Sequence, residues 1–407
     1  MTERLFLHDS HLTRCEATVL SAVEIKTGFD ILLDRSVFFP NAGGQPADHG
    51  TLQYGETVVH VLGADEAGEE IVLHTDAALP VGSTVSCTLD WARRFDMMQQ
   101  HTGEHILSYS FFTLFGAVNV GFHLAEDYGT IDMDKPLTHE QVLEAERYAN
   151  ALLFDDRPVT AKLYDSEEDI KDLPLRKHAE GLTAPIRIVT VEGADCCTCC
   201  APHCYRTGEV GFAMFTDHIA YKGGTRLTFL CGMRALRHAR AMHDSIDTVA
   251  RRFSTSRDNT ATAVQKQAEE LSEAHRREKD LTERLTDLMA EGLRAKAVPC
   301  GPYTVVCALT GELGPNGIRR LGQSVTGDRT VTLLLDTSND RISYLVATGS
   351  SVSVDAGELI KAVNPLLCGK GGGRGHMAQG SAPACHNAEE AKEQLEQYLI
   401  SRMKAEK

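Results

Sequence analysis

The stretch from Met242 to Lys296 constrains the fold of this chain most, because it divides the sequence into two parts of different character. It is highly charged, nearly free of aromatic residues, and without proline or internal glycine before Gly292. We therefore predict a long helix or helical hairpin over residues 242–297. The helix has an apolar stripe of coiled-coil type that is interrupted at Glu278. Two interpretations are therefore open: a solvated linker between domains, or a contact in a dimer. The stripe is formed by Leu271, Ala274, Leu281, Leu285 and Leu288.

Residues 1–90 consist of short apolar runs separated by Gly, Pro, Asn and Asp, which predicts a small β-barrel or sandwich. One loop in this region, FFPNAGGQPADHG at 38–50, has two interpretations. Pro40, Gly43 and Gly44 are typical of β-turns. Alternatively, the glycines let a substrate approach main-chain amides, with Ser36 and Gln45 as polar contacts.

The segment RRFDMMQQHTGEHIL opens a helix that we predict to run from Arg93 to Phe115 and to end at Gly116. His101 and His105 are four residues apart, so on a helix both imidazoles leave the same face. Two histidines at this spacing can share a divalent metal ion if the chain supplies further ligands.

Further ligands are present in a cysteine-rich loop, since five of the twelve cysteines lie between Cys196 and Cys204. Cys199 and His203 are again four residues apart, and together with the helix histidines they form a nitrogen and sulfur set that suits Zn²⁺. Two other interpretations stay open: a structural zinc knuckle, or C-x-x-C redox pairs. The redox pairs would be Cys196 with Cys199 and Cys197 with Cys200. We predict an α/β metal-binding core over residues 91–241.

After residue 298 the pattern predicts a C-terminal α/β domain that extends to residue 407. It contains a glycine-rich loop, CGKGGGRGH, in which two cations bracket three glycines. Such a loop can lay amides and positive charge along a phosphate backbone, although a flexible connector has the same composition. The residues concerned are Lys370, Gly371, Gly372, Gly373 and Arg374. The predicted fold class is therefore α+β and multidomain.

The net charge of −16 argues against a general polyanion-binding protein. Residues 298–407 carry 11 basic and 11 acidic side chains, so the acidic excess lies entirely in the first 297 residues. Nucleic-acid contact is thus expected to be local, and it meets less repulsion in the C-terminal region. The charged start of the sequence resembles no export signal, and no run is long enough to span a membrane, so we expect a cytoplasmic protein with reduced thiols.

Several stretches together resemble one family, the long form of the AlaX proteins, which are free-standing relatives of the editing domain of alanyl-tRNA synthetase. The stretches are DRSVFFPNAGGQPADHG, MMQQHTGEHILS, GFHLAEDYGTIDMD, CCAPHCYRTGEVG and CGKGGGRGHMAQG. They occur in the family's order over almost the full length. The resemblance implies zinc ligands at His101, His105, Cys199 and His203, and a glycine-rich substrate motif at Gly43, Gly44 and Gln45. It also implies a C-terminal DHHA1-type domain that binds tRNA.

The chain departs from the family pattern at two places. Ser36 replaces a threonine that is thought to sense the substrate's hydroxyl. The usual C-G-G-T-H is here Cys199-Cys200-Ala201-Pro202-His203, which keeps the ligand spacing, removes the glycines and leaves Cys200 as a rival ligand.

The resemblance implies zinc-dependent hydrolysis of tRNA for alanine that carries the wrong amino acid, serine or glycine. Glu104 is a candidate base because it lies next to His105 in the sequence. Two alternatives remain. HTGEH also fits the H-x-x-E-H signature of zinc metallopeptidases. The altered cysteine loop would also fit a catalytically inactive tRNA-binding module. The expected partners are tRNA and mischarged aminoacyl-tRNA, together with a second copy of the chain bound through the linker or the C-terminal domain.

Overall fold

The structure is a computed structural model that describes residues 2–176, 184–311, 313–338, 340–384 and 388–405. Its contacts divide the chain into two compact units, Met1–Thr248 and Val249–Lys407, and each is described by itself. The finer division at residues 90, 241 and 297 stays a prediction. Within the described ranges, no helix combines the length and the apolar character needed to cross a bilayer.

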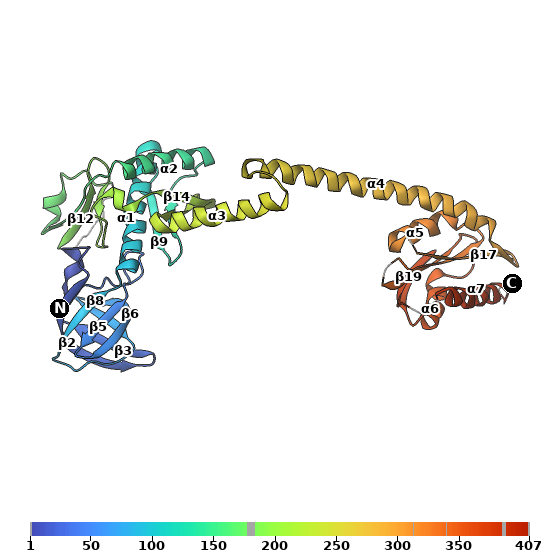
Figure 1. Cartoon of the computed structure of the whole chain (residues 1–407), viewed down its shortest axis with the longest axis horizontal. Helices are drawn as coiled ribbons and strands as arrows, with labels where there is room; N and C mark the ends of the chain where they lie inside the picture. The colour runs from blue at the N-terminus through green and yellow to red at the C-terminus, as the bar shows by residue number, and fades with distance from the viewer. Residues whose placement is uncertain (1, 177–183, 312, 339, 385–387, 406–407) are drawn as a thin grey trace. The chain divides into compact units, whose positions relative to one another are not determined.

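The first unit begins with a closed six-stranded barrel (Figure 1) in which the strand order is β2-β3-β7-β6-β5-β8. Closure through the β2–β8 pairing makes the region a barrel rather than a sandwich. Alternating residues of each strand point inward, as period-two burial requires, and Ile31, Leu52 and Leu73 are completely buried there. The strands are β2 (Arg14–Ile25), β3 (Gly28–Leu33), β5 (Gly50–Tyr54), β6 (Thr57–Ala67), β7 (Glu70–Thr75) and β8 (Thr84–Leu89). Beside the barrel, β1 (Glu3–Arg4) pairs with β4 (Arg35–Ser36).

The predicted histidine helix is confirmed as α1 (Trp91–Phe115), although it begins earlier than Arg93 because Asp90 caps it by accepting a hydrogen bond from the Arg93 amide. It ends at Gly116, whose φ of 60° is the left-handed conformation that glycine favours. Helix α2 (His139–Phe154) packs against it and begins with a capping box of Thr138 and Gln141. The middle of α1 is buried on all sides, so it forms the core of this unit.

Two sheets complete the first unit around α1. One has the strand order β14-β15-β10-β9, and the other has the order β11-β12-β13. The first contains β9 (Asn119–Leu124), β10 (Gly129–Met133), β14 (Ala213–Tyr221) and β15 (Gly224–Cys231). The second contains β11 (Val159–Tyr164), β12 (Ile186–Val191) and β13 (Cys196–Thr198), and it leads directly into the cysteine-rich loop.

The predicted linker is a pair of helices, α3 (Gly232–Arg252) and α4 (Thr260–Ala295), separated by a 3-10 turn at Arg257–Asn259. The last part of α4 belongs to the core of the second unit, because Leu285, Met289 and Leu293 pack against that unit's buried residues. Of the predicted apolar stripe, Leu271, Leu281 and Leu288 are exposed.

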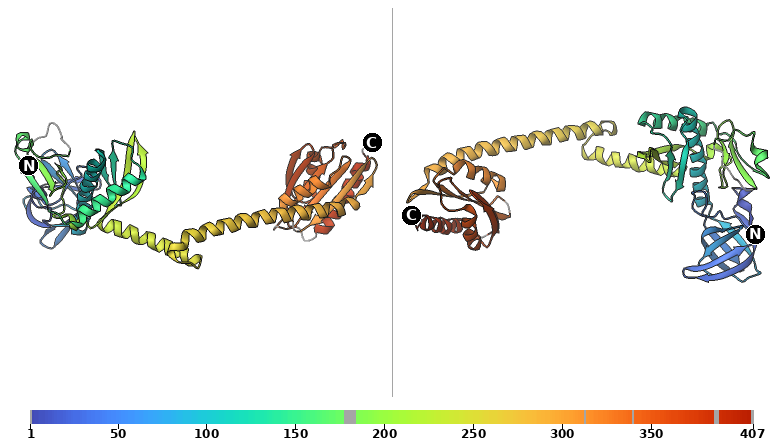
Figure 2. Two further views of the ribbon diagram at one scale, coloured as in Figure 1. Left: turned by 90° about the horizontal axis from the view of Figure 1, so that it is seen from above. Right: turned by 180° about the vertical axis from the view of Figure 1, so that it is seen from behind.

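The second unit is a six-stranded sheet of order β16-β17-β18-β19-β21-β20, covered on both faces. Helices α6 and α7 cover one face, and α5 and the end of α4 cover the other (Figures 1 and 2). The helices are α5 (Gly314–Val325), α6 (Ala356–Leu366) and α7 (Ala388–Ala405). The strands are β16 (Val298–Cys300), β17 (Tyr303–Thr310), β18 (Thr330–Asp336), β19 (Arg341–Thr348), β20 (Lys370–Arg374) and β21 (Met377–Pro383).

The prediction of a glycine-rich loop at 370–374 is wrong, since these residues form β20, the edge strand of a hairpin with β21. The glycines serve this pairing, because a Cβ on Gly371 or Gly373 would lie 2.5 Å from the α-carbon of its partner on β21. A Cβ on Gly372 would meet open space. Lys370 and Arg374 are both exposed at this edge.

Candidate metal centre

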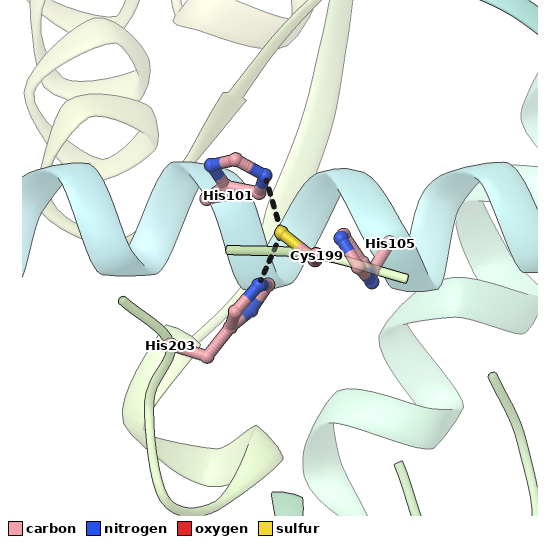
Figure 3. Close-up of side chains that lie close together, drawn as sticks. All are labelled: His101, His105, Cys199 and His203. Carbon is pink, nitrogen blue, oxygen red and sulfur yellow. Dashed lines mark hydrogen bonds between the residues drawn. The ribbon is translucent and has the colours of Figure 1, made fainter. Parts of the chain in front are cut away.

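Four side chains that are far apart in the sequence converge on one point of the first unit (Figure 3). His101 and His105 leave the same face of α1, and their ring centroids are 5.5 Å apart. The Cys199 Sγ lies 3.4 Å from His101 Nε2 and 3.3 Å from His203 Nε2. One donor atom from each of the four residues lies within 4.8 Å of the others. Three imidazoles and one thiol arranged in this way have the composition of a tetrahedral zinc site.

The loop that carries Cys199 and His203 keeps its shape without the family's glycines. None of the residues 199–203 has a left-handed φ, so glycine is not required there. The buried Arg187 guanidinium holds the loop, donating from Nη1 to the carbonyls of Cys199 and Ala201 at 2.8 Å each. Ala201 packs into the barrel core, whereas the Cys200 side chain is exposed and outside the group. Cys199 is therefore the cysteine that lies among the histidines.

Each of the three histidines has a polar partner at Nδ1. Gln45 Oε1 lies 2.8 Å from His101 Nδ1, and Thr102 Oγ1 lies 3.0 Å from His203 Nδ1. Asp195 Oδ2 lies 3.1 Å from His105 Nδ1. The Gln45 carbonyl oxygen and the Asp195 carboxylate can only accept, so His101 and His105 donate to them from Nδ1, and a histidine that does so keeps its Nε2 available for a metal. This arrangement orients all three rings as metal ligands.

The electrostatics of the group favour a thiolate. Burial alone raises the pKa of the Cys199 thiol, but the charge of His101 and its hydrogen bond to the sulfur lower that pKa well below its ordinary value. Burial lowers the pKa of His203 to about 3, so this ring is neutral. A thiolate and a neutral imidazole are the protonation states in which these side chains bind metal ions.

The glycine-rich barrel loop contacts the metal-binding group directly through Gln45, and its Gly44 packs against Phe122 of β9. Gly44 has a φ of 77°, and a Cβ there would lie 2.9 Å from the Phe122 carbonyl oxygen, while Gly43, with a φ of 58°, faces open space. The Gly44 carbonyl accepts a hydrogen bond from the amide of Leu124 at 2.8 Å. The Phe122 ring lies 5.0 Å from the ring of His101, so Gly44 serves the contact between barrel and core.

Ser36 is buried in a local turn next to the same loop. Its Oγ accepts a hydrogen bond from the Phe38 amide at 3.0 Å and lies 3.4 Å from the Phe38 carbonyl. The hydroxyl proton therefore has only a long local contact in the described part of the chain.

Glu104 lies beside His105 with its two carboxylate oxygens in different surroundings. Oε1 accepts hydrogen bonds from Asn119 Nδ2 at 2.7 Å and from Ser108 Oγ at 2.5 Å. Oε2 lies 3.9 Å from His105 Nε2, on the side of the nitrogen that is free for a metal. Adjacent residues of a helix are about 100° apart around its axis, yet this oxygen comes close to the His105 ring.

A buried ion pair, which sequence reasoning missed, joins the barrel to α1. The Arg94 guanidinium is completely buried, and its Nε lies 3.0 Å from Asp48 Oδ2. It also donates to the carbonyls of Ser10 and Val37 at 2.9 and 2.7 Å. Sequence reasoning also missed Thr102 and Asp195, since a lone polar residue beside a ligand carries no distinctive spacing.

Residues 323–401 match the DHHA1 domain family. The chain is 28% identical over 395 residues to the alanyl-tRNA editing protein AlaX-L of Pyrococcus horikoshii, covering 94% of this chain and 95% of the relative. It is 27% identical to the alanyl-tRNA editing protein Aarsd1 of Mus musculus, covering 92% and 90% of the two chains.

The similarity extends to alanine–tRNA ligases, of which the chain spans less than half. That of Halorubrum lacusprofundi is 29% identical, and the match covers 99% of this chain and 44% of the ligase. Among solved structures, the C-Ala domain of Aquifex aeolicus alanyl-tRNA synthetase matches at 26% identity with a TM-score of 0.24, covering 26% of this chain and 97% of that domain. The chain is therefore similar to AlaX-L over almost the whole of both chains, and it carries a match to the DHHA1 domain family near its C-terminus.

Proposed function

We propose that this protein hydrolyses the ester between a wrong amino acid, serine or glycine, and the tRNA for alanine, with Zn²⁺ bound by His101, His105, Cys199 and His203. The observation that carries the proposal is the convergence of these four donors, in a chain whose full-length relatives are named alanyl-tRNA editing proteins. The three imidazoles, each held at Nδ1, and the low pKa of the Cys199 thiol support zinc as the bound ion.

An aminoacyl ester is already activated, so the site needs a positioned water and stabilised charge more than a strong nucleophile. The zinc ion would supply a Lewis acid that polarises water or the carbonyl, or would hold the substrate in place. Glu104 Oε2 lies on the Nε2 side of His105, where it can take the proton of the attacking water. The Gln45 amide nitrogen is buried and has no hydrogen-bond partner in the described part of the chain, so it can donate to the substrate.

Discrimination against the correct amino acid is the harder task, since alanine lacks only the hydroxyl of serine. A site that hydrogen-bonds this hydroxyl leaves its own polar group unpaired when alanine binds. Ser36 is our candidate for this contact. The Ser36→Ala variant should lose its preference for seryl-tRNA over alanyl-tRNA, and a preference that survives intact would reject the assignment.

The alternatives fit less well. Metallopeptidases with an H-x-x-E-H signature usually take a downstream carboxylate as their third ligand, whereas a cysteine and a histidine complete this group. An inactive module was suggested by the altered loop, but Arg187 holds that loop with both donors in place. In the second unit, Lys370 to Arg374 remain our candidate contact to tRNA, as exposed cations on an edge strand. We also retain a homodimer through α4 or the second unit as a proposal.

The function is tested by measuring zinc content and seryl-tRNA deacylation in the wild type, in Cys199→Ala and in Cys200→Ala. The neighbouring Cys200 is exposed and lies outside the ligand group, so its variant is the matched control. We expect stoichiometric zinc and activity in the wild type and in Cys200→Ala, and loss of both in Cys199→Ala. Casein cleavage without deacylation would favour the peptidase, and tRNA binding without zinc or deacylation would favour the inactive module.

A further inference from the structure

We propose that Asp195 is a positioning residue that holds His105 in the orientation in which its Nε2 binds the metal. The proposal rests on the zinc site of the proposed function, but not on the reaction carried out there. Asp195 lies outside the four-ligand group.

The contacts of Asp195 define its role. The carboxylate is almost completely buried, with 1% of the residue exposed. Its Oδ2 lies 3.1 Å from His105 Nδ1, and its Oδ1 accepts a hydrogen bond from Arg176 Nε at 2.6 Å. The Cys197 Sγ lies 3.5 Å from the same Oδ2 and 3.2 Å from His105 Nδ1. A buried carboxylate held between Arg176 and these groups has little rotational freedom, so it offers the His105 Nδ1–H a rigid acceptor.

The backbone around Asp195 is also fixed. Asp195 lies in the turn between β12 and β13, where its carbonyl accepts a hydrogen bond from the Val191 amide at 2.7 Å. The Arg176 amide donates to the Cys196 carbonyl at 2.8 Å, which ties the arginine to the same turn. Because β13 leads directly to Cys199, one hairpin both supplies a ligand and orients a histidine on α1.

The same neighbourhood has the composition of a second metal site, since His105, Asp195 and Cys197 offer donors within 4.8 Å of one another. Arg176 argues against a second cation there. Its guanidinium already contacts Asp195 at 2.6 Å and lies 3.8 Å from Cys197 Sγ, so the positive charge that this group would attract is supplied by the protein. The geometry therefore assigns one metal ion, with Asp195 behind one of its ligands.

Removing the partner of a metal-binding histidine typically lowers metal affinity about 10–100-fold, because the ring loses both its orientation and part of its basicity. The Asp195→Asn variant keeps the shape of the side chain and removes its charge. We expect its zinc affinity, measured by competition with a chelator, to fall by at least about tenfold at a stoichiometry of one. With Co²⁺ in place of zinc, we also expect a changed visible absorption spectrum.

A matched control is Asp96→Asn, which removes a carboxylate that pairs with Arg234 at 2.7 Å on the same unit without touching a ligand. Its zinc affinity and Co²⁺ spectrum should equal those of the wild type. The control thus shows whether a loss of zinc affinity comes from His105 or from the general effect of breaking a partly buried ion pair. The Cys197→Ala variant should still bind one zinc ion.

The proposal is overturned if Asp195→Asn folds and keeps wild-type zinc affinity and Co²⁺ spectrum, if both aspartate variants weaken the metal equally, or if the wild type binds no zinc. Binding of two ions by the wild type and one by Cys197→Ala would establish the second metal site instead. Because every readout is metal binding, a wild type that binds zinc but does not deacylate seryl-tRNA would reject the proposed reaction and leave the role of Asp195 standing.

Discussion

Glu104 shows at the scale of one residue how the structure changes the meaning of a motif. In the sequence it is the acid of an H-x-x-E-H pattern, and on an ideal helix it lies about 100° around the axis from His105. In the structure Ser108 and Asn119 hold one carboxylate oxygen, which leaves the other 3.9 Å from His105 Nε2. The proposed role of Glu104 as the base therefore depends on Ser108 and Asn119, which lie outside the motif.

The Glu104→Gln variant should lower kcat for seryl-tRNA deacylation by about 10²–10⁴-fold, since the amide cannot accept the proton of the attacking water. Its zinc content should stay at the wild-type level, because Glu104 is not among the four donors. Single-turnover deacylation and metal analysis of the same preparations measure both quantities. Loss of zinc together with activity would show that Glu104 supports the site and is not the base.

At the scale of elements, the sequence predicted what depends on local patterns. Gly116 is a local signal, and α1 ends at it as predicted, whereas the cap at Asp90 was missed. Such helix ends follow from capping and period, which depend on neighbours in the sequence.

The features that the sequence predicted wrongly or did not reveal depend on residues that are brought together only by the tertiary fold. Glycines at 371–373 are typical of a loop, yet they form an edge strand because β21 approaches too closely for any Cβ at two of them. The four ligands were predicted from spacing, whereas their Nδ1 partners Gln45, Thr102 and Asp195 come from separate segments of the first unit. Of these three partners only Gln45 was singled out, and for a different role.

The two glycines of the barrel loop form a matched pair for testing the contact between barrel and core. Both have positive φ, so alanine at either position costs about 1–2 kcal/mol in backbone strain. Only at Gly44 would the added Cβ also press on the Phe122 carbonyl, at 2.9 Å. We expect Gly44→Ala to lower the free energy of unfolding of the first unit more than Gly43→Ala. Trp91, the single tryptophan of the chain, lies in this unit and reports its unfolding by fluorescence; equal losses would exclude the steric argument.

Asp336, the last residue of β18, binds the backbone at the start of α5. Its carboxylate accepts hydrogen bonds from the amides of Leu313 and Gly314 at 3.0 Å each and from Thr310 Oγ1 at 2.6 Å. Burial raises the pKa of Asp336, but these hydrogen bonds and those from Ser338 outweigh it and lower the pKa below its ordinary value. A carboxyl group with a lowered pKa in the folded state stabilises the protein above its unfolded pKa, and this contribution is lost as the pH falls through the folded value.

The Asp336→Asn variant should therefore lose about 1–3 kcal/mol of stability in the second unit near neutral pH, and its stability should fall less steeply than that of the wild type below about pH 4. Hydrogen exchange of the α5 amides measures this unit without interference from the first. The exposed Asp328, which accepts one hydrogen bond from Ser350 Oγ at 2.9 Å, provides the control Asp328→Asn. An unchanged exchange rate in Asp336→Asn would show that the carboxylate does not hold the helix.

At the scale of the whole molecule, charge is distributed unevenly between the part that carries the proposed zinc site and the part proposed to bind tRNA. The first 297 residues carry the acidic excess, and residues 298–407 are neutral. A polyanion such as tRNA is therefore repelled less by the second unit, and contact there must rely on a few placed cations. Lys370 and Arg374 stand at the two ends of β20, an exposed edge strand with glycines between them, which gives a phosphate backbone room to approach.

The double variant Lys370→Ala with Arg374→Ala should bind tRNA more weakly, and its log Kobs should depend on log salt with a slope shallower by about 1–2, because two phosphate contacts are lost. Zinc content should not change, since all four donors belong to the first unit. At saturating tRNA the deacylation rate should recover, because the second unit contributes binding and not chemistry. Lys404→Ala, an exposed cation on α7, is the control. If the control changes the salt slope as much as the double variant does, the contact depends on the overall charge of the unit and not on the edge strand.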